Sequence, residues 1–371
     1  MVKPDSGATK ADRPPTSAGG TAGRDARASL MRWRPPVTAQ HLLRWDTGLL
    51  VVVIAIGILG ASTSSEFLTG SNMFNLGLQS GEIAIMALPM TLIVISGEID
   101  LSVASVMGMA SALLGYLFAR GWPMPAIFVV VLLVGMLAGA INGLLVTRLG
   151  LPSLAVTIGT LGLYRGVADI VLGPNTISNF PAGYASIGVN PVPGTDLSFS
   201  ALVFIVLAVT FGVVLHFTPV GRSIFAMGAS PEAATFAGIR VKRVKTLLFV
   251  VSGAVCSLAG VLLTFRLSTA VNTNGVGLEL DVVAVVLLGG VSIFGGKGSI
   301  IGVVLGVLAF AGIQNALLLT NFNQEAASIP VGGLLLLSVF VPSIALLIGR
   351  LRNRITARGQ ARLPVIGPDH G

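Results

Sequence analysis

The stretch GRSIFAMGASPEAATFAGIRVKRVK, residues 221–245, lies between two apolar blocks and predicts a short capped helix. Ser230 suits the N-cap, Pro231 suits the first helical position, and Glu232 places negative charge in the first turn. Gly238 then supplies a stop. Two interpretations remain open. The stretch is either a topological loop whose positive charge fixes orientation in a membrane, or a docking element for a soluble partner that drives the membrane part. Its basic residues are Arg222, Arg240, Lys242, Arg243 and Lys245.

The composition is that of a membrane protein. Of 371 residues, 53% are hydrophobic and only 10% are charged, whereas a soluble domain carries about 25% charged residues. The 47 glycines fit close helix packing in lipid. The net charge of +8 indicates membrane orientation and anionic headgroups more than nucleic acid. Cys256 is the single cysteine, which excludes an intramolecular disulfide.

Apolar segments predict about ten transmembrane helices in an all-α polytopic membrane domain, residues 45–349. A disordered basic cytoplasmic tail, residues 1–44, precedes it, and a basic cytoplasmic tail, residues 350–371, follows it. The expected spans are 48–62, 73–95, 101–118, 124–146, 153–172, 199–217, 246–265, 282–294, 299–319 and 329–348.

The distribution of basic residues predicts that both termini are cytoplasmic. Residues 173–198 contain no Lys or Arg, as expected of an external loop. Arg148, Lys297 and the 221–245 loop fall on the cytoplasmic side of the predicted topology. Arg120 and Arg266 fall on the outside, against the pattern.

An internal repeat is visible in the sequence. Residues 138–147 align with residues 311–320, and six of the ten positions are identical. Upstream, Glu98-Ile99-Asp100-Leu101 resembles Glu279-Leu280-Asp281-Val282. An odd number of spans separates the copies, so we expect two inverted repeats, a common transporter architecture. Chance similarity between two Gly/Ala/Leu-rich segments is the alternative.

Three spaced motifs resemble the permeases of sugar-type ATP-binding-cassette importers, the ribose, xylose, rhamnose and autoinducer-2 branch. They are residues 228–239 (GASPEAATFAGI), 96–103 (SGEIDLSV) and 288–298 (LGGVSIFGGKG), and the resemblance extends from about Gly48 to Ile348. It implies a type II importer fold and a coupling loop that docks in a groove of a separate ATP-binding subunit. The coupling residues it indicates are Gly228, Ser230, Pro231, Glu232, Ala233 and Gly238.

The resemblance also implies partners and a location. A permease of this branch is expected to form a homodimer, or a heterodimer with a second permease, in the bacterial plasma (inner) membrane. It is expected to receive cargo from an external or periplasmic solute-binding protein. Residues 163–166, 265–268 and 274–279 look most like rhamnose-type members, with autoinducer-2 and ribose types next. The binding protein selects the cargo in this family, so the permease sequence carries little of that information.

No catalytic constellation, cofactor site or metal site is predicted. His41, His216 and His370 are scattered along the chain, which supports neither a metal centre nor a triad. The Gly295-Gly296-Lys297-Gly298 stretch resembles a phosphate loop only superficially, because Gly298 stands where Ser or Thr is required. We expect a tight cytoplasmic turn there and no ATP hydrolysis by this chain.

Polar residues within the spans are few, and each is costly in lipid unless its hydrogen bonds are satisfied. They either join helices or line a translocation path for hydroxyl-rich cargo at the repeat interface. Asn142 and Asn315 occupy equivalent repeat positions, which favours the path slightly. The candidate residues are Gln79, Glu82, Asn142, Gln314 and Asn315.

The acidic landmarks Glu98 and Asp100, and Glu279 and Asp281, each precede an apolar run. We expect them to act as helix caps, because an Asp at a helix start accepts hydrogen bonds from free backbone N–H groups. The alternative is that they form charged gates. A different class of function, a self-contained secondary transporter or channel, would need ionisable groups deep in several spans. Only Glu82, Arg165 and Asp169 qualify.

Overall fold

The computed structural model describes residues 38–320 and the positions 329, 332, 333 and 336. The regular secondary structure of these residues is helical, without a strand, as the sequence predicts. The helices are α2 (Thr38–Thr63), α3 (Gly70–Ile95), α4 (Val103–Ala119), α5 (Met124–Arg148), α6 (Ser153–Leu172), α7 (Ala182–Val189), α8 (Phe199–Phe217), α9 (Pro219–Ala229), α10 (Pro231–Phe236), α11 (Val241–Leu267), α12 (Leu278–Leu288) and α13 (Ile300–Leu319).

Seven of these helices are long and apolar enough to cross a membrane: α2 from Trp45 onward, α3, α5, α6, α8, α11 and α13. Their bounds follow the predicted spans closely. The predicted 1–44 tail needs a correction at its end, because residues 38–44 belong to α2. The predicted C-terminal tail, and most of the predicted 329–348 span, lie outside the described residues.

Two predicted spans are short helices in the structure. Helix α4 has 17 residues and α12 has 11. At a rise of 1.5 Å per residue, α12 covers only about 17 Å of a hydrocarbon core of about 30 Å. The predicted 282–294 span is therefore corrected: its helix ends at Leu288, and residues 289–299 continue as turns.

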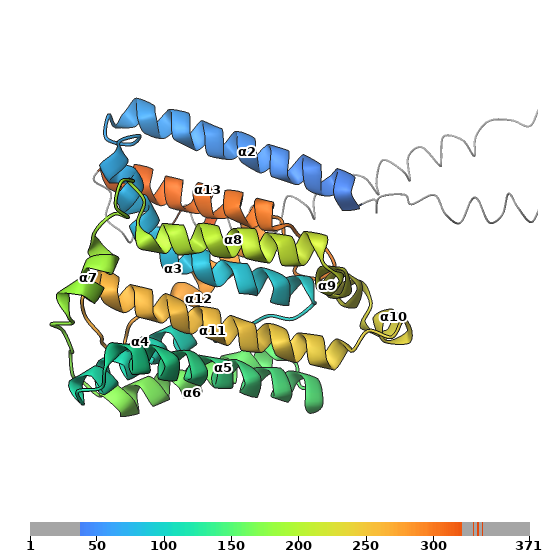
Figure 1. Ribbon diagram of the computed structural model, residues 1–371. Helices are drawn as coiled ribbons and strands as arrows, with labels where there is room; N and C mark the ends of the chain where they lie inside the picture. The colour runs from blue at the N-terminus through green and yellow to red at the C-terminus, as the bar shows by residue number, and fades with distance from the viewer. Residues whose placement is uncertain (1–37, 321–328, 330–331, 334–335, 337–371) are drawn as a thin grey trace, which may run out of the picture. The chain divides into compact units, whose positions relative to one another are not determined.

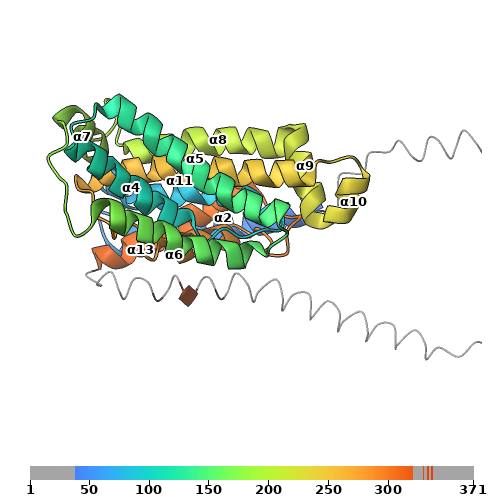
Figure 2. The same ribbon diagram turned by 90° about the horizontal axis from the view of Figure 1, so that it is seen from below.

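The long helices lie side by side, with α9 and α10 at one end of the bundle and α7 at the other in both views (Figures 1 and 2). We call the α9–α10 end the basic end. Glycines permit a close contact between α5 and α11. A Cβ atom added to Gly139 would lie 2.0 Å from the backbone oxygen of Phe249, and one added to Gly253 would lie 2.0 Å from that of Gly135. Only glycine permits this approach.

The two copies of the repeat run in opposite directions. Helix α4 begins at Val103, after the loop of residues 96–102 that follows Ile95 at the C-terminal end of α3. The segment that follows the end of α12 reaches the same place, because the Gly296 N–H donates to the Ile95 oxygen at 2.8 Å. Helix α4 therefore starts at the end of the bundle where α12 finishes. This opposite sense agrees with the predicted inverted repeat.

Candidate functional site at the basic end

Helix α10 forms as the sequence predicts. The Ser230 hydroxyl accepts a hydrogen bond from the Ala233 N–H at 3.2 Å and donates one to the Glu232 carboxylate at 3.2 Å. Pro231 occupies the first turn, and Gly238 adopts a φ of 84°, the left-handed conformation that ends a helix. The predicted start and stop of this capped helix are confirmed.

Helix α10 presents nearly all of its surface outward. Ala234 is its one buried residue, whereas Glu232, Ala233 and Thr235 are exposed. Phe236 is 93% exposed at its C-terminal end. A short capped helix held by a single small residue contributes little to the core, so its exposed face is free to contact another molecule.

The three sequence motifs meet where α9 ends. A Cβ atom added to Gly228 would lie 1.8 Å from the Ile95 oxygen and 2.6 Å from the Gly296 nitrogen. One added to Gly295 would lie 2.8 Å from the Gly228 oxygen and 3.0 Å from the Gly97 Cα. The backbones of the three motifs thus touch without side chains between them. We call this contact, made by residues 95–98, 228–230 and 295–298, the motif junction.

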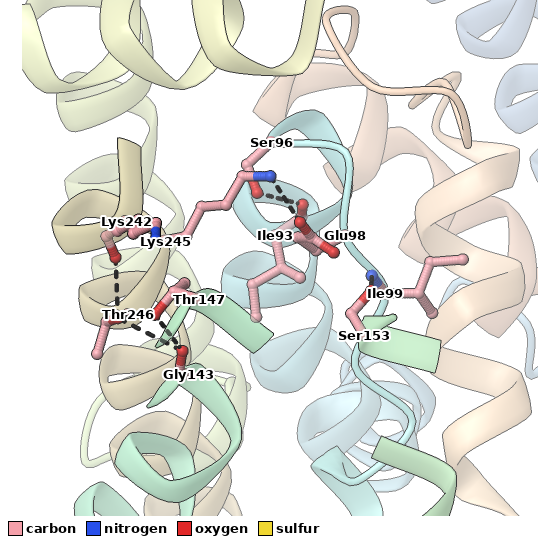
Figure 3. A network of polar contacts seen from close by, with 10 residues as sticks. All are labelled: Ile93, Ser96, Glu98, Ile99, Gly143, Thr147, Ser153, Lys242, Lys245 and Thr246. Atoms are coloured by element: carbon pink, nitrogen blue, oxygen red, sulfur yellow. Dashed lines mark hydrogen bonds and ion pairs between the residues drawn. The ribbon is translucent and has the colours of Figure 1, made fainter. Parts of the chain in front are cut away.

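An ion pair fastens the motif junction to α11. The Lys245 ammonium lies 2.5 Å from the Glu98 carboxylate, and the two side chains are only 11% and 16% exposed. Figure 3 shows Lys245 extending from α11 to Glu98 in the loop after α3. A pair so withdrawn from water is costly to break, because either partner alone would keep a poorly solvated charge.

Hydrogen bonds of the same network join α5, α6 and α11 (Figure 3). The Thr147 and Thr246 hydroxyls lie 2.8 Å apart and link α5 to α11. The Ile99 N–H donates to the Ser153 hydroxyl at 3.1 Å and links the loop to the start of α6. The loop between α3 and α4, residues 96–102, is therefore bonded to α6 and α11, and it packs against the 295–298 turn.

Asp100 is buried at the start of α4, with 3% of its surface exposed. Its carboxylate accepts from the Ser102 N–H at 3.0 Å, the Ser102 hydroxyl at 2.6 Å and the Ser252 hydroxyl at 3.3 Å. Burial away from water raises the pKa of Asp100, and the hydrogen bonds from Ser102 and Ser252 lower it by less. Ser102 is the N-cap residue of α4, so Asp100 lies two residues before the N-cap position and bonds the N-cap residue itself instead of the first free N–H groups of the helix.

The second acidic landmark differs. Gly277 is the N-cap of α12, so Glu279 and Asp281 lie inside its first turn. The Glu279 Oε2 atom is buried and has no hydrogen-bond partner among the described residues. Negative charge in a first turn still suits the positive end of the helix, but Asp281 is not at the N-cap position.

The five candidate path residues do not meet at one place in the contacts of the described residues. Glu82 pairs with Arg266 at 3.0 Å, between α3 and α11. Asn142 donates to the Ser102 hydroxyl at 2.8 Å. Asn315 and Asn72 exchange two amide hydrogen bonds of 2.8 and 2.9 Å. Gln79 is exposed and Gln314 is half-buried. Glu82, Asn142 and Asn315 thus join helices, and a role in cargo passage stays a prediction.

Several partners in these contacts were not singled out from the sequence. Ser102, Ser252 and Asn72 are short polar residues without a distinctive motif. Arg266 is more informative, because a buried acid such as Glu82 requires a cation nearby. Arg165 donates to the backbone oxygens of Asn274 and Gly275 at 2.6 Å each, which holds the 268–277 segment against α6.

Comparisons with known proteins agree with the motifs. Residues 72–339 match the family described as branched-chain amino acid transport system, permease component. The chain is 33% identical to the autoinducer 2 import system permease protein LsrC of Shigella flexneri over 295 residues, which are 80% of this chain and 85% of that protein. It is 33% identical to LsrD of Escherichia coli strain SMS-3-5 over 290 residues, 76% of this chain and 87% of that protein. No solved structure matches significantly.

Proposed function

We propose that this chain docks a separate ATP-binding subunit on α10. The chain belongs to the family described as branched-chain amino acid transport system, permease component, and it is a permease of the sugar-type ATP-binding-cassette importers. The observation that carries the proposal is the motif junction. Three motifs from distant parts of the sequence meet at the base of an exposed, capped helix. A force applied to α10 would reach the loop before α4 through backbone contacts, and α11 through the Glu98–Lys245 pair.

The chain is proposed to rely on its partner for ATP hydrolysis. A phosphate loop offers free backbone N–H groups to the phosphates. In the 295–298 turn, the Gly296 N–H is already donated to the Ile95 oxygen, and the turn packs against Gly228. This packing supports a structural turn at the junction and not a nucleotide site.

The proposed assembly contains two permease chains, two ATP-binding subunits and an external solute-binding protein. The second permease is either another copy or a related chain, since LsrC and LsrD resemble this chain equally in identity. The proposed cargo is a monosaccharide or related small polyol. The rhamnose-like motifs and the autoinducer 2 relatives make rhamnose, ribose and autoinducer 2 the compounds to test.

A secondary transporter is the less supported function. Ion coupling requires ionisable groups in the spans that can change partners. Glu82 and Arg266 satisfy one another, and Arg165 is engaged by backbone oxygens. These contacts support helix packing more than an ion path.

Uptake by reconstituted complexes tests the function. The chain, with the ATP-binding and solute-binding proteins of its genomic neighbourhood, is placed in proteoliposomes with labelled rhamnose, ribose or autoinducer 2. Uptake that requires ATP and persists with ionophores is expected. Uptake driven by an ion gradient without ATP would establish the secondary transporter instead.

Docking and orientation are tested separately. Glu232→Lys is expected to uncouple ATP hydrolysis from uptake while membrane insertion stays normal. Unchanged transport would leave the loop with a topological role only. Reporters fused after Lys245 or after Arg354 should be cytoplasmic, and one near Asn190 external. An external signal at Lys245 would overturn the proposed orientation.

A further inference from the structure

Two phenylalanines outside the candidate spans are unusually exposed. Phe236, in α10, is 93% exposed, and Phe294, in the segment between α12 and α13, is 90% exposed. No other large hydrophobic side chain in the described part of the chain reaches these values. Lipid accounts for exposed apolar residues on the spans, but neither phenylalanine lies on one. Exposed apolar side chains of this kind mark interaction sites.

Phe294 is held outward by a defined turn. The Ser292 N–H donates to the Lys297 oxygen at 3.0 Å, and the Gly295 N–H donates to the Ser292 oxygen at 2.9 Å. Gly295 and Gly296 have φ values of 78° and 71°, which other residues rarely adopt. We call residues 291–298 the glycine turn. Its tip presents Ile293 and Phe294, with the exposed Lys297 beside them.

The glycine turn and α10 belong to one local body. The Gly296 N–H bonds the end of α3, and a Cβ atom added to Gly296 would lie 3.1 Å from the Ala229 Cα. Ser230, the next residue, caps α10. The surface around α10 is polar as well as exposed, with Glu232, Thr235 and Arg240 all outward. The turn is thus anchored beside a polar, exposed surface. Burial of a phenylalanine from such a surface in a protein pocket is favourable, because it removes apolar area from water.

We propose that the glycine turn is a second docking element for the ATP-binding subunit, with Phe294 as its apolar anchor and Lys297 facing an acidic group of that subunit. The inference rests on the proposed function, because it assumes that α10 binds the same partner. The turn joins α12 to α13, which belong to the second repeat. Contact of the subunit with both α10 and the glycine turn would therefore transmit its motion to the second repeat as well as to α11.

Binding measurements on the permease in nanodiscs test the proposal. The titrant is the ATP-binding subunit of the genomic neighbourhood, and the variants are Phe294→Ala, Phe236→Ala, Glu232→Lys and the control Phe217→Ala. Phe217 is 78% exposed but ends the span α8. We expect Phe294→Ala to weaken binding about tenfold or more, with Phe217→Ala unchanged. If Phe236→Ala weakens binding and Phe294→Ala does not, the second contact is overturned and the proposed function stands. If neither Phe236→Ala nor Glu232→Lys weakens binding, the proposed docking itself fails.

Thiol labelling distinguishes a protein pocket from lipid. Phe294→Cys is made in a chain whose buried Cys256 is replaced by Ser, and inside-out vesicles receive a membrane-impermeant maleimide. We expect modification without the ATP-binding subunit and protection of at least fivefold with it. Leu149→Cys, in the exposed loop between α5 and α6, shows that the reagent reaches this side. No modification of Phe294→Cys without the subunit would place the turn in lipid, and equal modification with and without it would exclude the contact. Either result overturns the proposal.

Discussion

The two acidic landmarks start from nearly the same sequence and reach different environments. Asp100 is buried, and its carboxylate is bonded to Ser102 and Ser252 at the start of α4. Asp281 lies in the first turn of α12 and is half-buried, and the Oε2 atom of nearby Glu279 has no hydrogen-bond partner in the described part of the chain. The repeated pattern lies at a helix start in both copies. Whether the acidic side chain is buried and hydrogen-bonded depends on the helices that pack around it.

The surroundings of each helix start explain the difference. At α4, the loop before the helix is fastened on several sides, by Glu98 to Lys245 and by Ile99 to Ser153. At α12, the preceding segment is held by Arg165 through its backbone oxygens and by the Asn274 amide, which donates to the Ser111 hydroxyl at 2.8 Å, but none of these bonds reaches the Asp281 carboxylate, and Gly277 begins the helix with a φ of 91°. The Asp100 carboxylate therefore has a defined set of hydrogen-bond donors, while Asp281 has the favourable field of a helix end together with the neighbouring charge of Glu279.

Gly228→Ala should reduce stability and uptake the most, because it disrupts the backbone contact at the motif junction, next to the first landmark. The added Cβ atom would lie 1.8 Å from the Ile95 oxygen, and backbone must shift to admit it. We expect a loss of about 3 kcal/mol or more in stability and loss of coupled uptake, measured by thermal unfolding in detergent and by transport. Gly159→Ala is the matched control, since nothing lies within 4 Å of its added Cβ. Equal effects of the two substitutions would contradict a tight junction.

Lys245→Met should have the next largest effect by removing the cation that faces Glu98. The remaining carboxylate is poorly solvated, so we expect a stability loss of about 2–3 kcal/mol, below the cost for a fully buried pair. A double-mutant cycle with Glu98→Gln measures the coupling. The double variant should recover part of the loss, because no unpaired charge remains. Strict additivity of the two substitutions would show that the pair contributes no coupling.

Asp100→Ala and Asp100→Asn separate capping from charge at the first landmark. The Ala variant loses the acceptor for the Ser102 groups and should cost about 1–2 kcal/mol. The Asn variant keeps an acceptor and can donate to Ser252, so it should retain most uptake. Abolished uptake in an Asn variant that folds and assembles normally would assign the charge to a gate.

The pH dependence of stability sharpens this test. Burial raises the pKa of Asp100 in the folded protein, so folding favours its protonated form. As pH rises from the unfolded pKa of about 3.9 through the folded value, the wild-type chain should lose stability relative to Asp100→Asn. Unfolding temperatures of the two chains between pH 4 and 8 measure the difference. A constant difference over that range would contradict a raised pKa.

Asp281→Asn should have the smallest effect. The carboxylate is not at the N-cap position and makes no cap hydrogen bond among the described residues, so only its interaction with the helix end is lost. We expect a change of about 0.5 kcal/mol or less, with uptake retained. A loss comparable to that of Asp100→Ala in thermal unfolding would mean that the two landmarks are equivalent after all.

The sequence by itself determined the elements that depend on neighbouring residues. Helices α6 and α8 have the bounds that hydrophobicity predicts, Ser153–Leu172 and Phe199–Phe217. The capped α10 and its stop at Gly238 also follow from local chemistry, because side chain, backbone N–H and turn lie within a few residues of one another. The internal repeat could also be recognised from the sequence, because its two copies keep the same motifs in the same order along the chain.

Only the tertiary structure decided which polar groups are paired. Glu98 and Lys245 are 147 residues apart, Glu82 and Arg266 are 184 apart, and Asn72 and Asn315 are 243 apart. No local pattern selects such partners, because the choice depends on how the helices cross and on which glycines let them approach. The path of the chain after α12 was decided in the same way. The helix itself ends locally at Leu288, where Gly290 adopts a φ of 79°, but only the folded structure shows that the following glycine turn contacts Ile95 and Gly228 instead of continuing the predicted span to residue 294.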